Sequence, residues 1–167
     1  MIGSRPVAVR RGPGWLWGWA GGKVWVVDGL RGAELPEGAT ETQRWQLQSP
    51  AEVSGLRGGL YRALTGRAMR PDGDLDEVPE RVVLVASELA TNAIAHGLPP
   101  TTVRLLHVDG RCILDVADHD LTDVPELADS RPPGAGGLGL QLALKLSLEV
   151  GWYATDTTKH VWAAFPA

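Results

Sequence analysis

Three polar residues whose types suit catalysis, Glu88, Asn92 and His96, recur every four positions in the chain. On a helix this spacing places them in one polar stripe beside an apolar one. An amide oxygen is a suitable ligand for a hard cation such as Mg²⁺, and a carboxylate one turn away can accept a proton from a nucleophile. Gly97 follows directly and predicts the end of the helix. A solvated helix face with a capping histidine is the alternative explanation of the same stripe.

A second candidate group, Asp118, ends a β-branched and apolar run that begins at Arg111 and predicts a strand. Strand alternation places Asp118 on one face with three residues of core type, Cys112, Leu114 and Val116. A carboxylate that finishes a buried face needs a hydrogen-bond donor, because burying it unpaired is costly. The amino group of a ligand would be such a donor. An aspartate that only caps the following loop is the alternative.

A third candidate segment, residues 134–140, is rich in glycine and runs directly into the apolar segment 141–149. The second segment is apolar on nearly every side and predicts a buried helix. Glycines before a helix let backbone N–H groups approach an anion closely, and the helix N-terminus favours negative charge. The same pattern also fits a plain flexible loop that enters a core helix.

The order of these segments resembles the N, G1 and G2 boxes of the GHKL ATPase superfamily. Within that superfamily, the chain is most similar to the small anti-sigma factor serine/threonine kinases of actinobacteria and their single-domain relatives. The resemblance covers about residues 43–167 and is carried by residues 87–97, 116–118 and 136–140, with Trp152 and residues 159–163 closing the match.

The resemblance implies a role for each candidate residue, with ATP and Mg²⁺ as cofactors. Asn92 would hold the Mg²⁺ that bridges the ATP phosphates, and Glu88 would be the general base that activates a serine or threonine hydroxyl. Asp118 would accept a hydrogen bond from the adenine amino group. The phosphate loop would be formed by Gly136, Gly137, Leu138 and Gly139.

The resemblance also implies a function and protein partners. The expected protein is an ATP-binding regulator, a serine/threonine kinase of the anti-sigma factor type. It would phosphorylate an antagonist protein, sequester a sigma factor, or do both, and a homodimer is compatible with this. The alternative is a non-catalytic nucleotide-binding module of the same fold. Glu88 and Asn92 favour phosphate transfer, because a site that has lost its catalytic activity need not keep both residues.

Three positions depart from the family pattern. Asp120 stands where the G1 box often has a glycine, and it adds charge and bulk where the chain would pass close to the nucleotide. Ala135 stands where the related histidine kinases have a glycine. Both departures favour the non-catalytic module. His160 stands where relatives often have threonine, which puts a polar phosphate contact in doubt.

A metal-dependent hydrolase is a separate alternative, suggested by the run 118–120 (Asp-His-Asp) together with His96. Histidine and carboxylate side chains bind transition metals. Adjacent residues on a strand point to opposite faces, however, and no second histidine stands at helical ligand spacing. Solvation of a loop is the usual explanation of such a charge run.

Composition narrows the function classes. The chain has 167 residues and a formal net charge of −4, which argues against general binding of nucleic acid. No apolar run approaches the length of a membrane span and no signal-peptide core is present, so a cytoplasmic protein is expected. Cys112 is the single cysteine and falls on an apolar strand face, where a small buried hydrophobe is expected rather than a nucleophile.

The elements that must position these residues divide near residue 40. Residues 1–40 form a tryptophan-rich extension, in which segments 15–20 and 23–27 predict a hairpin around Gly21-Gly22, followed by a linker over residues 29–42. Residues 41–167 form the expected ATP-binding domain.

Within that domain the pattern predicts an α+β fold. A short strand (44–47), a helix from Ser49-Pro50 to Gly66, and the stripe helix after Pro79 come first. A hairpin (101–108 and 111–117), a lid (121–135), the glycine-rich helix, and a last hairpin (151–155 and 159–165) follow. These elements predict a two-layer sandwich of helices on a mostly antiparallel sheet, which resembles the Bergerat ATP-binding fold.

Overall fold

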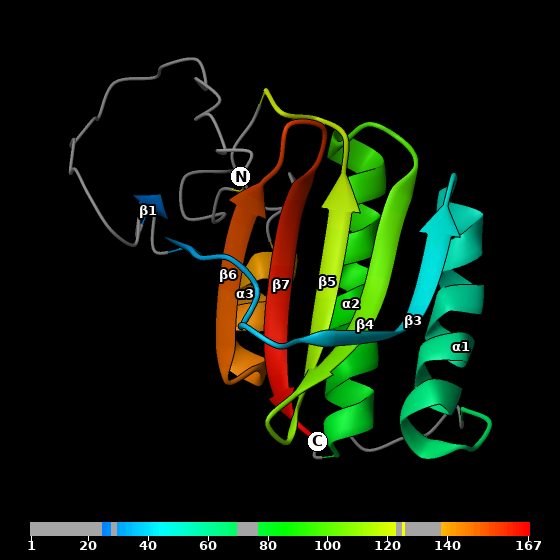
Figure 1. Ribbon diagram of the computed structural model, residues 1–167. Coiled ribbons are helices and arrows are strands. Elements are labelled where there is room, and N and C mark those ends of the chain that lie inside the picture. Colours follow the sequence, from blue (N-terminus) through cyan, green and yellow to red (C-terminus); the bar gives the residue numbers. More distant parts are fainter. Residues whose placement is uncertain (1–24, 28–29, 70–76, 123–124, 126–137) are drawn as a thin grey trace.

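The computed structural model describes residues 25–27, 30–69, 77–122, 125 and 138–167. Within these residues a layer of helices covers one face of a single sheet (Figure 1). The strands are β1 (Trp25–Val27), β2 (Leu30–Gly32), β3 (Thr40–Leu47), β4 (Thr101–Val108), β5 (Arg111–Asp118), β6 (Glu149–Ala154) and β7 (Lys159–Pro166). The helices are a 3₁₀ turn (Pro50–Glu52), α1 (Val53–Thr65), α2 (Val78–His96) and α3 (Leu138–Leu146).

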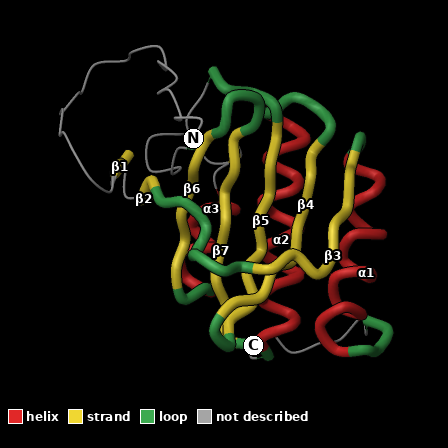
Figure 2. Tube along the Cα trace, viewed as in Figure 1, coloured by secondary structure: helices red, strands yellow, loops and turns green. Residues whose placement is uncertain are grey.

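The sheet has the strand order β1-β2-β6-β7-β5-β4-β3, and every pair is antiparallel except β2 with β6. Figure 2 shows the helices together on one side, with α1 behind β3, α2 behind β4 and β5, and α3 behind β6. The predicted α+β two-layer sandwich with a mostly antiparallel sheet is confirmed.

The central hairpin forms as its turn residues predict. Asp109 and Gly110 both have positive φ, 47° and 69°, which is the backbone geometry of a two-residue hairpin turn. β4 and β5 then pair in register from Val108–Arg111 up to Thr102–Ala117. Strand alternation sends one set of β5 side chains toward the helices and the other set to the opposite, outer face of the sheet.

Capping residues determine where the helical layer begins and ends. The carboxylate of Glu52 accepts hydrogen bonds from the backbone N–H groups of Gln48 and Ser49, and one 3₁₀ turn precedes α1. Regular α-helix therefore starts at Val53 rather than at Pro50. α1 ends at Gly66, whose φ of 70° is the left-handed conformation that glycine adopts at helix ends.

The polar stripe lies on α2, which packs between α1 and α3. The apolar face of α2 is almost fully buried and includes Val82, Val83, Val85, Ala86, Leu89 and Ala90. Burying a side chain of this size stabilises the fold by about 1.5–3 kcal/mol for each valine or leucine. The stripe helix is therefore fixed in place by its apolar side, and its polar side faces the start of α3.

The glycine-rich helix begins and ends earlier than the pattern predicts. α3 covers Leu138–Leu146, and Glu149 already belongs to β6. Of its residues only Gly139, Leu140 and Ala143 are buried, whereas Leu144 is 42% exposed, so only one side of the predicted buried helix is in fact buried. The segment 141–149 is so uniformly apolar that its sequence marks neither the end of α3 nor the side of α3 that faces solvent.

The predicted linker also contains strands. β2 lies within residues 29–42, and β3 starts at Thr40 rather than at Arg44. Residues 33–39 cross the outer face of the sheet, on the side away from the helices (Figure 1). The indole N–H of Trp162 donates a 2.8 Å hydrogen bond to the carbonyl of Ala33. The backbone N–H of Ala33 in turn donates to the backbone carbonyl of Trp152 at 2.9 Å.

Other predicted segments lie outside the described residues. These are the strand 15–20 with its Gly21-Gly22 turn and most of the lid 121–135. The division of the chain near residue 40 stays a prediction.

Candidate functional site

The structure brings together the candidate residues that it describes. Glu88 and Asn92 are half-buried on α2, Asp118 is the last residue of β5, and Gly139 lies in the first turn of α3. Leu138 is exposed at the start of α3. Gly136 and Gly137 lie outside the described residues.

Gly139 lies directly against the polar stripe. A β-carbon built on Gly139 would come 2.7 Å from Asn92 Nδ2 and 3.1 Å from Glu88 Cβ. A side chain at this position would push the Asn92 amide aside and crowd Glu88, so glycine favours the close approach of α3 to α2. The Glu88 and Asn92 pair thus lies beside the N-terminal turn of a helix, where the helix dipole favours negative charge.

Gly97 joins the end of α2 to Asp118. Its backbone is extended (φ −93°, ψ −172°), so the predicted helix end is confirmed but the glycine is not needed for a left-handed turn. A β-carbon on Gly97 would come 2.5 Å from Asp118 Cγ and 2.5 Å from the carbonyl oxygen of Ala93. The backbone N–H of His119 donates to the carbonyl of Leu98 at 3.1 Å and ties the same two segments together. The stripe and Asp118 therefore lie at the same end of the domain.

Asp118 is a buried carboxylate, 6% exposed. Its Oδ1 accepts a 2.8 Å hydrogen bond from the backbone N–H of Asp120 and lies 3.6 Å from the Lys159 ammonium. Burial raises the pKa of Asp118, and the Asp120 N–H and Lys159 oppose this effect only in part. Burial therefore outweighs these two contacts, and both of them reach Oδ1, as expected of a carboxylate whose other oxygen can accept a hydrogen bond from a ligand.

Sequence reasoning missed Thr101 at this end of the sheet. Thr101 is the first residue of β4, is 1% exposed, and lies next to Asp118 because Thr102 pairs with Ala117. Among the described residues its hydroxyl has no hydrogen-bond partner. A buried polar group without a partner is rare, so this hydroxyl is available to a ligand or a water molecule. Nothing in the sequence distinguishes this threonine from an ordinary strand residue.

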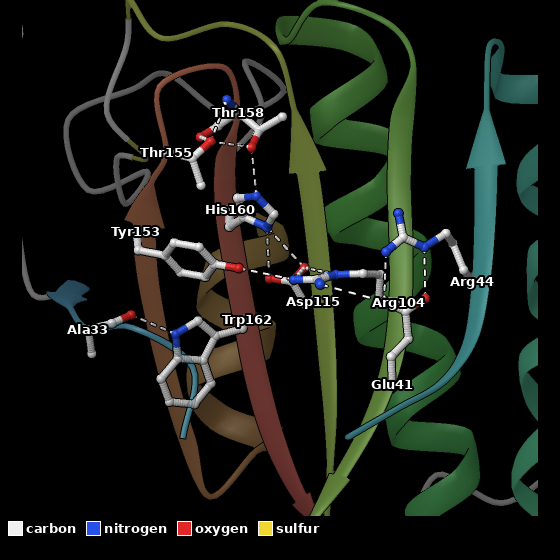
Figure 3. Close-up of polar contacts among 10 residues, drawn as sticks. All are labelled: Ala33, Glu41, Arg44, Arg104, Asp115, Tyr153, Thr155, Thr158, His160 and Trp162. Atoms are coloured by element: carbon white, nitrogen blue, oxygen red, sulfur yellow. Dashed lines mark hydrogen bonds and ion pairs between the residues drawn. The ribbon is translucent and has the colours of Figure 1, made fainter. Parts of the chain in front are cut away.

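His160 lies away from this site. It belongs to the outer face of the sheet, where its Nδ1 contacts both oxygens of Asp115 at 3.0 and 3.2 Å (Figure 3). Its Nε2 lies 2.8 Å from the hydroxyl of Thr158. The departure at His160 therefore does not affect the helix-facing side on which Asp118 lies.

Asp115 is the centre of this outer-face network and is 0% exposed. Arg104 on β4 reaches its Oδ2 with Nε at 2.9 Å and Nη2 at 2.8 Å, and the same Nη2 donates to the Tyr153 hydroxyl (Figure 3). The Tyr153 ring stacks on His160 with ring centroids 4.4 Å apart. Burial, and then the nearby Asp115 charge, raise the pKa of Tyr153 to about 12. This network is structural, because the sheet separates it from the stripe.

The structure does not support the metal-dependent hydrolase. Among the described residues, no three histidine, cysteine, aspartate or glutamate side chains lie close enough together to hold a metal ion. His119 contacts the carbonyl of Thr157, and the Asp120 carboxylate accepts hydrogen bonds from the backbone and hydroxyl of Thr122. The polar group of His119 therefore contacts the neighbouring β6–β7 turn, and that of Asp120 is used within its own loop.

Cys112 is buried and unpaired, as its strand position predicts. Burial raises the pKa of its thiol to about 11, so almost none of it is thiolate at neutral pH. It is a small core hydrophobe and takes no part in the site.

The described part of the site fits a nucleotide. The buried Asp118 carboxylate lies at one end of the sheet with the Thr101 hydroxyl, which has no partner among the described residues, and Gly97 packs directly against Asp118. The Asn92 amide and the Glu88 carboxylate lie one helical turn apart at the Gly139 contact. These groups offer oxygen ligands for a hard cation and an acceptor for a proton.

Comparison with known proteins agrees with this geometry. The family model for the histidine kinase-like ATPase domain matches residues 48–165, which is more than half of the chain. A search of curated proteins finds no match. In the part of the chain that is described, no helix is both long and apolar enough to cross a membrane. The chain belongs to the family of histidine kinase-like ATPase domains, whose ligand is ATP.

Proposed function

We propose that this protein is an ATP-binding regulator that acts as a serine/threonine kinase of the anti-sigma factor type. It would phosphorylate an antagonist protein, sequester a sigma factor, or do both. The observation that carries the proposal is the contact between the α2 stripe and the start of α3. There Gly139 lies against both Glu88 and Asn92, so a candidate base and a candidate cation ligand share one position in the fold.

The chemistry assigns a separate task to each side chain. The amide oxygen of Asn92 would hold Mg²⁺, which neutralises phosphate charge when it is bound. The Glu88 carboxylate would accept the proton of a serine or threonine hydroxyl on the partner protein. Asp118 would hold the adenine ring by accepting a hydrogen bond from its amino group.

Two substitutions on α2 separate binding from transfer. The wild type is mixed with Mg-ATP and candidate antagonist proteins, and phosphate on serine or threonine is measured alongside calorimetric nucleotide binding. Glu88→Gln should keep nucleotide affinity and lose transfer by ~10²–10⁴-fold, because a general base commonly contributes that much. Asn92→Ala should lose binding and transfer together. Thr91→Ala, an exposed position on the same helix, is the matched control and should change neither.

A Glu88→Gln protein that transfers phosphate at the wild-type rate would remove Glu88 from the mechanism. Binding of a sigma factor is measured separately, with and without Mg-ATP, because sequestration does not need transfer.

The second candidate function is a nucleotide-binding module without transfer. Asp120 favours it, because this residue replaces a glycine of the family pattern and its carboxylate is held by Thr122 in the loop that follows β5. Wild-type protein that binds Mg-ATP but phosphorylates no antagonist would support the module over the kinase.

A further inference from the structure

The last residue of β5 and the first residue of β7 are direct partners in the sheet. Asp118 pairs with Lys159, and the Lys159 ammonium lies 3.6 Å from Asp118 Oδ1. The side chain of Lys159 is only 13% exposed. Lysine is rarely buried to this extent, because its ammonium loses hydration unless other polar groups replace it.

Lys159 lies on the nucleotide side of the sheet. Val161, Ala163 and Phe165 on the same strand belong to the core beneath the helices, and alternation places Lys159 on that face. Three neighbouring strands therefore present three polar groups at one end of this face. They are the Thr101 hydroxyl on β4, the Asp118 carboxylate on β5 and the Lys159 ammonium on β7.

A carboxylate reads only part of an adenine ring. The exocyclic amino group is a donor and suits Asp118, but the ring nitrogens on either side of it, N1 and N7, are acceptors. Carboxylates cannot donate to them, whereas an ammonium has three donors. Since Lys159 and the Asp120 N–H both approach Oδ1, Oδ2 is the oxygen that we assign to the amino group.

We propose that Lys159 is a base-recognition residue, whose ammonium donates a hydrogen bond to the ring nitrogen next to the amino group that Asp118 holds. The proposal rests on ATP binding at the site described above. It makes the Asp118–Lys159 pair a paired acceptor and donor, which matches one edge of adenine and gives the chain a specificity that a lone aspartate lacks.

The test uses full-length protein and three nucleotides, the Mg²⁺ complexes of ATP, 1-deaza-ATP and 7-deaza-ATP, titrated by calorimetry. Each analogue lacks one ring nitrogen. The wild type should bind one analogue about tenfold to 100-fold more weakly than ATP, which is the usual value of a hydrogen bond to a charged donor. Lys159→Met keeps the apolar stem and should bind ATP and that analogue equally. Lys145→Met, an exposed lysine on α3, is the matched control and should keep the wild-type preference.

The outcomes are separable. Equal wild-type affinity for ATP and both analogues would overturn the proposal whether or not any variant folds. A Lys159→Met protein that still discriminates would also overturn it, because another group would then be the donor. Wild-type protein that binds no ATP would remove the proposed function and this proposal together. The identity of the discriminated analogue tells whether N1 or N7 receives the hydrogen bond.

Discussion

Gly97 lies against the carboxyl group of Asp118, with no room between them for a side chain. The glycine ends α2 and the aspartate ends β5, so this contact holds the end of the polar stripe beside the base-binding group. The backbone angles of Gly97 would suit any residue, so the requirement for glycine here is one of space alone.

Gly97→Ala should therefore act as an overpacking mutation at the site. One of its close contacts is the backbone oxygen of Ala93, which cannot move without distorting the helix end. We expect a loss of about 1–3 kcal/mol in the free energy of unfolding and weaker ATP binding. Denaturant unfolding and calorimetry measure the two effects. Gly55→Ala on α1, where an added β-carbon meets nothing within 4 Å, is the control and should not destabilise the fold.

Asp118→Asn should separate stability from binding. Because the pKa of Asp118 is raised in the folded protein, its contribution to stability is present in acid and is lost as the pH rises through the raised pKa. At pH 7 the ionised carboxylate therefore costs stability. The neutral asparagine should raise the melting temperature at pH 7 and weaken nucleotide binding.

This stability gain should shrink as the pH falls through the raised pKa of Asp118, and it should be gone below the usual aspartate value of 3.8. Thermal melts across the acid range measure it. Asp109→Asn, in the exposed hairpin turn, is the control for the same exchange of side chain at a position away from the site. A lower melting temperature for Asp118→Asn at pH 7 would mean that the pairing of Asp118 with Lys159 outweighs its burial.

Thr101→Val should weaken nucleotide binding without harming the free protein. Valine has nearly the same shape and removes a buried hydroxyl that has no partner among the described residues. The nucleotide-free protein should keep its stability or gain up to about 1–3 kcal/mol, while ATP affinity falls. Thr102→Val, one position along the same strand and on the other face, is the control. Unchanged ATP affinity in Thr101→Val would show that the hydroxyl does not contact the nucleotide.

Asp115→Ala should destabilise the fold and leave nucleotide affinity unchanged. It removes the common partner of Arg104 and His160 and leaves the Arg104 charge, 17% exposed, without its buried counter-ion. Breaking such a pair costs about 3–5 kcal/mol. Glu41→Gln is the control, because its contacts to arginine are at the surface and such pairs contribute about 0–1 kcal/mol. Urea unfolding measures both variants, and lost ATP binding in a folded Asp115→Ala protein would contradict the separation of the two faces.

Local chemistry explains which parts of this fold the sequence predicts. The turn at Asp109-Gly110, the helix end at Gly66 and the apolar face of α2 depend on neighbouring residues, and all three form as predicted. The start of β3 was missed because that strand lies at the edge of the sheet. Its first five residues are exposed, so no apolar alternation marks them.

The residues of the candidate site likewise fall into those that the sequence predicts and those that only the structure reveals. Residue type and spacing identified Glu88, Asn92 and Asp118, and the structure brings α2 and the end of β5 together. Lys159 and Thr101 became visible only through strand register, which connects residues far apart in the chain. Asp115 was hidden for a further reason, since a buried ion pair on an outer sheet face gives no periodic pattern.

Strand order also has a consequence for the timing of assembly. β2 is synthesised well before its partner β6, because Arg31 pairs with Gly151, far along the chain. The hydrogen bond from the Trp162 indole to the Ala33 carbonyl likewise forms only after β7 has been synthesised. Contacts between such distant residues form slowly, because a long loop must close first. Until β6 and β7 have been made, the apolar cluster on the outer face of the sheet is therefore incomplete, and this surface is open to chaperones and to aggregation.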